Sequence, residues 1–149
     1  MIQGVVVKKL SLYEDHRGWL TEAYRSDETP YKPEMAYVSF TKHNKMRGPH
    51  EHRKQSDFFI FTGPGKFIVY LWDNRKLSPT YKEKAKLVAG EEPISILIPP
   101  GVVHAYKCIS KTGGFNVNFP NMLYKGKDKK EEVDEIRHES DPSTEFKEW

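Results

Sequence analysis

The 149-residue chain carries 24 Lys and Arg against 21 Asp and Glu, a net charge of +3. This length suits one domain, with room for one core and one pocket but not for a separate cofactor-binding domain. Mixed charge excludes the concentrated basic patch of a nucleic-acid-binding protein, and no apolar run is long enough for a signal peptide or a membrane span. Cys108 is the only cysteine, so an intramolecular disulfide is excluded and we expect a reducing, cytoplasmic compartment.

Short runs rich in β-branched and aromatic residues follow one another along the chain, separated by Gly, Pro and Asn turn signals. They predict strands within residues 4–13, 18–24, 35–40, 57–61, 65–72, 94–100, 104–110 and 115–119. The clearest is 65–72, where Phe67, Val69 and Leu71 fall on one face. No window before residue 125 shows a 3.6-residue apolar repeat.

This pattern predicts an all-β fold, an antiparallel sandwich or barrel in one domain that spans residues 1–149. The barrel core is expected to contain large apolar residues of the predicted strands, namely Phe58, Phe61, Phe67, Val69, Leu71, Ile96, Ile98 and Val103. Residues 125–149 differ, because they are dense in charge and poor in apolar residues. One interpretation is a solvated, partly ordered tail; the other is an arm over the body, held by Ile136, Phe146 and Trp149.

The segment M-R-G-P-H-E-H at residues 46–52 places two histidines two positions apart. On a strand, His50 and His52 would share one face while Glu51 points away. Asp57 follows five residues later, and His104 comes after the sharp turn P-P-G at residues 99–101. Three imidazoles and one carboxylate that converge in a small barrel can hold Mn, Fe, Ni, Cu or Zn.

These two segments resemble the two cupin motifs, which implies a double-stranded β-helix, or jelly roll. Asp57 stands where glutamate is usual, and Cys108 stands where an asparagine is expected. A closer resemblance, to the dTDP-4-dehydrorhamnose 3,5-epimerases, is carried by four further motifs and by the ending with Asp-Pro and Trp. The motifs are D-H-R-G-W-L at 15–20, R-G-P-H at 47–50, L-S-P-T-Y at 77–81 and I-P-P-G-V-V-H-A-Y at 98–106. R-G-P-H-E-H-R at 47–53 is also similar to the R-G-x-H-A-H-K of the dTDP-4-keto-6-deoxyglucose 3,4-ketoisomerases.

The resemblance implies an isomerase that acts on a nucleotide sugar in deoxysugar or polysaccharide synthesis, with no required cofactor. A base removes the acidic proton beside the 4-keto group, and an acid returns a proton on the other face. By resemblance the base is His50 and the acid is a tyrosine, for which Tyr124 is the best candidate. His104 and His52 complete the predicted site, and Arg17 and Arg47 match arginines that grip the diphosphate.

Two departures from the family pattern stand out. The 3,5-epimerases have a lysine roughly where this chain has Asp57, and a carboxylate there repels the enolate. At about 4 Å and an effective dielectric near 20 the repulsion is roughly 4 kcal/mol, which slows the step about a thousandfold. The family also has a carboxylate near its C-terminus that orients the base, and the sequence does not show which acid takes this role.

The residues that break the epimerase pattern, His52 and Asp57, are the ones that complete a metal quartet with His50 and His104. A second hypothesis is therefore a metal-dependent cupin of another activity, such as a dioxygenase or a small-acid isomerase, with Mn, Fe, Ni or Zn. A third is a non-catalytic module that binds sugar nucleotides. Arg17, Arg47 and the S-P-T turn favour the enzyme of nucleotide sugars, because a cupin for small substrates does not need them.

The resemblance further implies a homodimer that exchanges an N-terminal strand, in which Arg17 reaches the pocket of the neighbour. The remaining histidines have no other candidate ligand or catalytic residue at a matching spacing. We expect them to be ordinary surface residues, and they are His16, His43 and His138.

Overall fold

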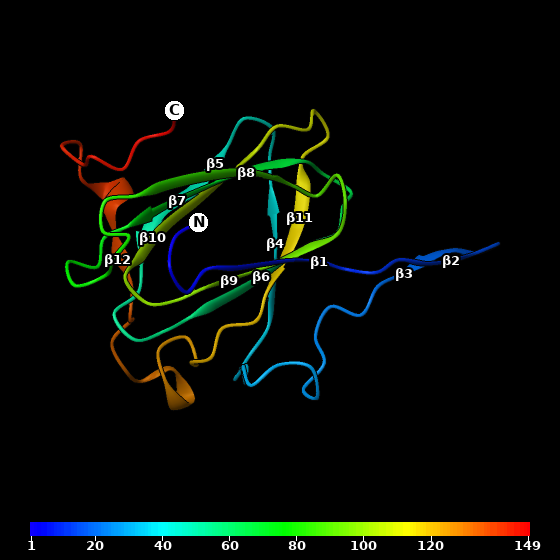
Figure 1. Ribbon diagram of the computed structural model, residues 1–149, viewed down its shortest axis with the longest axis horizontal. Helices are drawn as coiled ribbons and strands as arrows, with labels where there is room; N and C mark the ends of the chain where they lie inside the picture. The colour runs from blue at the N-terminus through cyan, green and yellow to red at the C-terminus, as the bar shows by residue number, and fades with distance from the viewer.

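The computed structural model, which describes all of residues 1–149, is built almost entirely from strands (Figure 1). The strands are β1 (Val6–Lys9), β2 (Tyr13–Asp15), β3 (Gly18–Leu20), β4 (Tyr37–Thr41), β5 (Met46–Glu51), β6 (Asp57–Phe61), β7 (Phe67–Asp73), β8 (Lys84–Ala89), β9 (Ile94–Ile98), β10 (Val102–Cys108), β11 (Gly114–Asn118) and β12 (Ile136–Arg137). Two short 3-10 helices, η1 (Lys127–Lys129) and η2 (His138–Ser140), lie in the C-terminal segment. Neither helix is long or apolar enough to cross a bilayer.

Ten of these strands form two five-stranded antiparallel sheets, and β2 and β3 form a separate hairpin. One sheet has the order β1-β9-β6-β11-β4 and the other the order β12-β5-β10-β7-β8. Consecutive strands mostly fall in different sheets, so the connections cross between two layers that enclose a core between them. The predicted all-β jelly-roll architecture is confirmed.

The core between the sheets contains most of the expected residues. Phe61, Phe67, Leu71 and Ile96 are fully buried there, as alternation along each strand predicts. The prediction was wrong for Phe58, which is only half-buried and packs against Tyr24, Tyr31 and Phe119 outside this core. Val103 is buried in a second, smaller cluster with Tyr70, Trp72 and Ala105.

Several strands differ from the expectation, among them β1, β3, β8 and β12. The strands within 4–13 and 18–24 are shorter than those runs, because β1 ends at Lys9 and β3 at Leu20. Strand β8 was not predicted, because Lys84–Ala89 alternates lysine with apolar residues too briefly to stand out, and it forms by pairing with β7.

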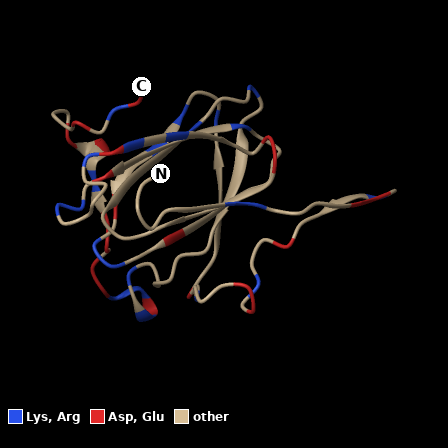
Figure 2. Cartoon of the chain, viewed as in Figure 1, with Lys and Arg blue, Asp and Glu red and all other residues tan.

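The C-terminal segment, residues 125–149, lies on the body of the protein and carries closely spaced basic and acidic residues (Figure 2). Ile136 pairs with Glu51 in the register between β12 and β5, and Phe146 packs against Trp72. The interpretation as an arm is therefore confirmed, and that of a solvated tail is wrong. His138 is also not an ordinary surface residue, because its Nε2 lies 2.9 Å from Glu51 Oε1.

The hairpin β2–β3 extends away from the body (Figure 1), and all of its residues are exposed. It carries Tyr13, Trp19 and Leu20, whose large apolar side chains are among the most exposed of their kind. A two-stranded hairpin alone is at best marginally stable in water, so this exposed hairpin gains little stability from its own two strands.

Candidate active site

Polar side chains from three strands meet at one end of the space between the sheets. His50 lies on β5, Asp57 begins β6 and His104 lies on β10. The register between β10 and β5 pairs His104 with His50, and their ring centroids are 4.5 Å apart. His52 follows β5 directly, and its ring centroid is 5.8 Å from that of His50. The sequence prediction that these histidines share one compartment is confirmed.

Gly48 makes the approach of β5 to β10 possible. Its φ is +80°, and a Cβ on this residue would lie 2.5 Å from the carbonyl oxygen of His104 and 3.1 Å from Nδ1 of His50. Only glycine tolerates this conformation and this contact without strain. The glycine of the R-G-P-H segment therefore brings His50 beside His104.

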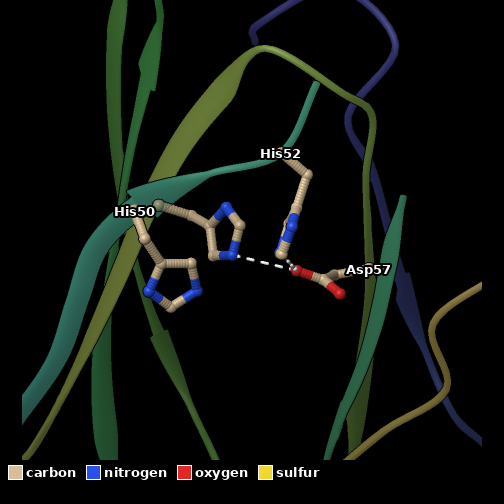
Figure 3. A group of neighbouring side chains, drawn as sticks. His50, His52 and Asp57 are labelled. Atoms are coloured by element: carbon tan, nitrogen blue, oxygen red, sulfur yellow. Dashed lines mark ion pairs between the residues drawn. The ribbon is translucent and has the colours of Figure 1, made fainter. Parts of the chain in front are cut away.

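Asp57 is buried and contacts two of the three imidazoles (Figure 3). Its Oδ2 atom is 3.1 Å from Nε2 of His52 and 3.1 Å from Nε2 of His104. One ligand atom from each of His50, His52, Asp57 and His104 can be chosen so that all lie within 4.8 Å of one another. Gln55 Nε2 donates to Asp57 Oδ1 at 2.9 Å, which fixes the carboxylate.

The outer nitrogens of two imidazoles point at main-chain carbonyls. His104 Nδ1 is 3.1 Å from the carbonyl oxygen of Val102, and His52 Nδ1 bonds the carbonyl oxygen of Asp134. A carbonyl only accepts, so each Nδ1 carries the proton and each neutral Nε2 presents a lone pair. Two lone pairs then face one carboxylate oxygen, and this arrangement needs a proton on one imidazole or a cation among them.

The pKa shifts describe the same balance of charge. Burial and the neighbouring His104 hold the pKa of His50 well below its usual value, so this imidazole is neutral near pH 7. Burial lowers the pKa of His52, but its hydrogen bond to Asp57 and the charge of Asp57 outweigh burial, so the net pKa is raised. Burial would raise the pKa of Asp57, yet hydrogen bonds with His104 and His52 hold that pKa well below the usual range. The cluster thus favours a carboxylate–imidazolium pair beside a neutral base.

The C-terminal segment supplies partners to two of these histidines. Glu135 Oε1 lies 3.9 Å from Nδ1 of His50, and the side chains of both are largely buried. The Asp134 carboxylate accepts hydrogen bonds from three main-chain N–H groups of the loop after His52, those of Arg53, Lys54 and Gln55. The segment that looked like a tail in the sequence therefore forms part of the site.

A cavity of about 930 Å³ opens over the cluster, within the size range of small-molecule sites. Its walls come from β4, β5, β10 and residues 120–139, and they include Tyr37, Arg47, His50, His52 and Tyr124. Hydrophobic, polar and charged residues all line it, so the cavity offers both apolar and polar contacts to a ligand.

The other predicted site residues fall in different places. Arg47 lines the cavity, and its guanidinium is bonded to Thr41 Oγ1 at 3.1 Å and to the carbonyl oxygen of Phe40 at 2.9 Å. Tyr124 also lines the cavity but is 50% exposed. Arg17 lies at the turn of the β2–β3 hairpin, paired with Asp15, and does not line the cavity of its own chain.

Sequence reasoning missed three residues that act on the cluster. Gln55 was hidden in a polar stretch between His52 and Asp57, although its place two residues before Asp57 on an extended segment was a usable signal. Asp134 and Glu135 gave no signal, because they are two of many acids in a charged segment and only the pairing of β12 with β5 selects them.

A jelly roll with a histidine–carboxylate cluster at the mouth of its barrel defines the protein as a cupin. The family model described as dTDP-4-dehydrorhamnose 3,5-epimerase matches residues 1–140. The chain therefore belongs to the dTDP-4-dehydrorhamnose 3,5-epimerase family and is an isomerase of the epimerase type.

Two relatives support this assignment. Over 135 residues the chain is 36% identical to the probable low-salt glycan biosynthesis epimerase Agl13 of Haloferax volcanii, covering 88% of this chain and 86% of the relative. Over 128 residues it is 35% identical to the spore coat polysaccharide biosynthesis protein SpsL of Bacillus subtilis, covering 83% of each.

Solved structures show the same fold. The dTDP sugar isomerase of Desulfovibrio desulfuricans superposes with a TM-score of 0.83 at 19% identity, over 95% of this chain and 87% of that one. The dTDP-4-dehydrorhamnose 3,5-epimerase of Sulfolobus tokodaii superposes with a TM-score of 0.72 at 25% identity, over 79% of this chain and 70% of that one.

Proposed function

We propose that the protein epimerises or isomerises a dTDP-4-keto-6-deoxyhexose, in deoxysugar or polysaccharide biosynthesis, by removing a proton next to the 4-keto group. The observation that carries this proposal is the largely buried imidazole of His50, which lines a cavity of about 930 Å³. Proton abstraction needs an unprotonated base, and burial together with His104 keeps His50 in that form. The proposed chemistry requires no cofactor.

His50 takes the proton from the carbon beside the ketone, and the electron pair moves onto the ketone oxygen to form an enolate. Glu135, 3.9 Å from His50 Nδ1, then faces the imidazolium that forms and stabilises its charge. This acid takes the orienting role that the resemblance implied without an assignment. Arg47 is proposed to contact the diphosphate, because it lines the same cavity and its guanidinium is held by β4.

The negative charge of Asp57 is paired with His52, so the enolate does not meet an unpaired carboxylate. Its partner His52 has a raised pKa, and a protonated His52 balances the carboxylate charge. The roughly 4 kcal/mol penalty expected for an unpaired carboxylate at this place is thereby offset. Nε2 of His104 lies 3.1 Å from the same carboxylate oxygen, and its ring lies against His50.

Deuterium exchange tests the proposal. Incubation with dTDP-4-keto-6-deoxyglucose in D2O should place deuterium at C3 or C5 and yield an isomerised sugar, both visible by NMR. His50→Gln should slow the exchange by about 100-fold or more, whereas His43→Gln, at an exposed position outside the cavity, should not. Binding of the nucleotide sugar with no exchange and no isomer would leave only the hypothesis of a non-catalytic binding module.

We also propose a homodimer in which the β2–β3 hairpin packs on the partner and Arg17 reaches the partner's cavity. The hairpin exposes Tyr13, Trp19 and Leu20 and extends away from the body (Figure 1). Light scattering should give twice the monomer mass of 17.4 kDa, and a monomer would contradict the proposal. The expected cytoplasmic location stays a prediction.

A second candidate function, a metal-dependent cupin, is favoured by the convergence of His50, His52, Asp57 and His104. The donor set of three imidazoles and one carboxylate fits Mn, Fe, Ni or Zn. The main-chain carbonyls that fix Nδ1 of His52 and His104 leave Nε2 available for a ligand bond, as metal-binding histidines require. A bound divalent ion would supply a Lewis acid and would balance the charge of Asp57.

Elemental analysis of protein purified without chelator separates the two candidates. About one equivalent of Mn, Fe, Ni or Zn, lost in Asp57→Asn and His52→Gln, would support the metal-dependent cupin. Full deuterium exchange in protein that is metal-free by the same analysis would support the cofactor-free epimerase.

A further inference from the structure

An epimerase needs an acid on the side of the sugar that faces away from its base. Strand β4 supplies a wall of the cavity that His50 does not, because β4 belongs to one sheet and β5 to the other. Along β4, Ser39 and Thr41 are buried, and Tyr37, which has the same parity and is 40% exposed, lines the cavity. Tyr37 and His50 therefore reach the cavity from different sheets.

The hydroxyl oxygen of Tyr37 is held by Asn118, its register partner on β11. The main-chain N–H of Phe58 donates to Asn118 Oδ1 at 2.9 Å, which fixes the orientation of the amide. Asn118 Nδ2 must then be the donor to Tyr37 Oη at 3.0 Å and to Asp57 Oδ1 at 2.8 Å. The Tyr37 oxygen thus accepts a hydrogen bond, and its own proton has no acceptor in the protein.

The hydroxyl groups of Tyr106 and Tyr31 already donate their protons in hydrogen bonds within the protein. Ser39 Oγ donates to Asn116 Oδ1 at 2.6 Å, so the contact of 3.0 Å between Ser39 Oγ and Tyr106 Oη uses the Tyr106 proton. Tyr31 donates to main-chain carbonyls, the nearest being that of Phe119 at 2.7 Å. Neither hydroxyl can give its proton to a ligand without breaking a buried hydrogen bond.

Tyr124, the tyrosine predicted from the sequence, is placed less well for proton transfer. It lies outside any strand, between β11 and η1, and is 50% exposed. No hydrogen bond fixes its hydroxyl, and the closest charged group along its ring is Lys125, 5.8 Å from the ring centroid. A catalytic acid needs a fixed position relative to the base, and Tyr37 has one.

We propose that Tyr37 is the catalytic acid of the proposed epimerisation and that it protonates the enolate on the side opposite His50. The Tyr37 O–H bond breaks as the new C–H bond forms, and the negative charge passes from the enolate to the phenolate. The Asn118 N–H bond stabilises this phenolate, while His50 keeps the proton that it removed. Exchange with solvent then returns both groups to their starting protonation states. Burial and the charge of Asp57 raise the pKa of Tyr37, so it holds its proton until the enolate forms.

This assignment rests on the proposed function, and the experiment separates the two. In D2O, Tyr37→Phe should still exchange the proton that His50 removes, because the base can return deuterium to the same face. Its yield of inverted sugar should fall by about 100-fold relative to exchange. Tyr124→Phe tests the competing assignment and should keep the wild-type ratio of inversion to exchange, whatever its effect on substrate binding. Binding of thymidine diphosphate and the urea-unfolding midpoint show that each variant retains its fold.

Inversion by Tyr37→Phe at the wild-type ratio would overturn the assignment and leave the proposed function intact. Exchange without inversion in Tyr124→Phe would also overturn it and would assign the acid to Tyr124. A wild-type protein that neither exchanges nor inverts a 4-keto nucleotide sugar would overturn both.

Discussion

The β2–β3 hairpin near the N-terminus and the C-terminal segment each carry a tryptophan. Only the tryptophan of the C-terminal segment packs against aromatic residues of the barrel. Trp19, in the β2–β3 hairpin, and Trp149, at the C-terminus, are each 48% exposed. The ring of Trp149 nevertheless lies 5.3 Å, centroid to centroid, from Tyr70 and from Trp72. No aromatic neighbour lies against Trp19, and the hairpin stands away from the body (Figure 1).

The difference shows how the two regions divide their roles. The C-terminal segment places Asp134 and Glu135 beside the histidine cluster of its own chain, so it completes a site that the barrel strands begin. The hairpin supplies no residue to the histidine cluster of its own chain. Its exposed apolar side chains support the proposed second copy.

The largest effect is expected from Asp134→Ala. This change removes the acceptor of three main-chain N–H bonds in the loop between His52 and Asp57. We expect a loss of roughly 2 kcal/mol in unfolding free energy, and a fall of about 100-fold in kcat/KM because the loop that carries His52 shifts. Urea unfolding and steady-state kinetics measure both.

Glu145→Ala in the same segment is the control, since Glu145 is exposed, does not line the cavity and makes no side-chain hydrogen bond to the body. Equal stability of Asp134→Ala and the wild type would mean that the segment merely lies on the barrel.

A smaller effect is expected from Glu135→Gln, which keeps the shape of the side chain and removes the charge near His50 Nδ1. We expect kcat to fall about tenfold, equivalent to ~1.4 kcal/mol of transition-state stabilisation, with KM nearly unchanged. Glu132→Gln also changes an acid that lines the cavity, but this acid is exposed and should leave kcat unchanged. An equal fall in kcat in both variants would show that Glu135 acts only through the overall negative charge of the segment, and not through its place beside His50.

Asp134 and Glu135 also show which part of the site the sequence could not predict. The spacing of His50, His52 and Asp57 predicted a cluster because strand alternation is a local property. The P-P-G turn before His104 added the third imidazole, and the resemblance supplied the fold that joins the two segments. Asp134 and Glu135 could not be selected, because a two-residue strand, β12, decides which acids of the segment meet the cluster.

Tyr37 is an intermediate case. Its inward parity with Ser39 and Thr41 follows from the sequence once β4 is assigned. Its free proton depends on Asn118, whose orientation is set by a main-chain N–H of another strand. A network of this kind across strands leaves no pattern in the chain.

The free energy of unfolding should depend on pH in two opposite directions, one set by His52 and the other by His50. The raised pKa of His52 gives stability that is present below the unfolded-state value of about 6.5 and is lost as pH rises through the folded-state value. The lowered pKa of His50 gives stability that is present above about 6.5 and is lost as pH falls towards its folded-state value. Unfolding free energy should therefore peak near neutral pH, as urea titrations of chelator-treated protein between pH 5 and 9 would show.

His52→Gln should flatten only the alkaline side of this curve, whereas His43→Gln should retain both sides. If the unfolding free energy of His52→Gln still falls above neutral pH, a group other than His52 is the protonated partner of Asp57. The C-terminal segment enters here as well, since the Asp134 carbonyl that binds His52 contributes to its raised pKa.

The smallest effect comes from the two tryptophans and contrasts the arms most directly. Trp149→Ala removes a ring that packs on Tyr70 and Trp72, so we expect the free energy of unfolding to fall by about 1 kcal/mol with the dimer intact. Trp19→Ala removes a ring with no aromatic neighbour in its own chain, so the monomer should lose less than in Trp149→Ala while the dimer weakens. Unfolding at several protein concentrations separates the two, because only the Trp19 effect should depend on concentration. If Trp149→Ala behaves in the same way, the C-terminal arm also belongs to the interface, and the distinction between the two regions fails.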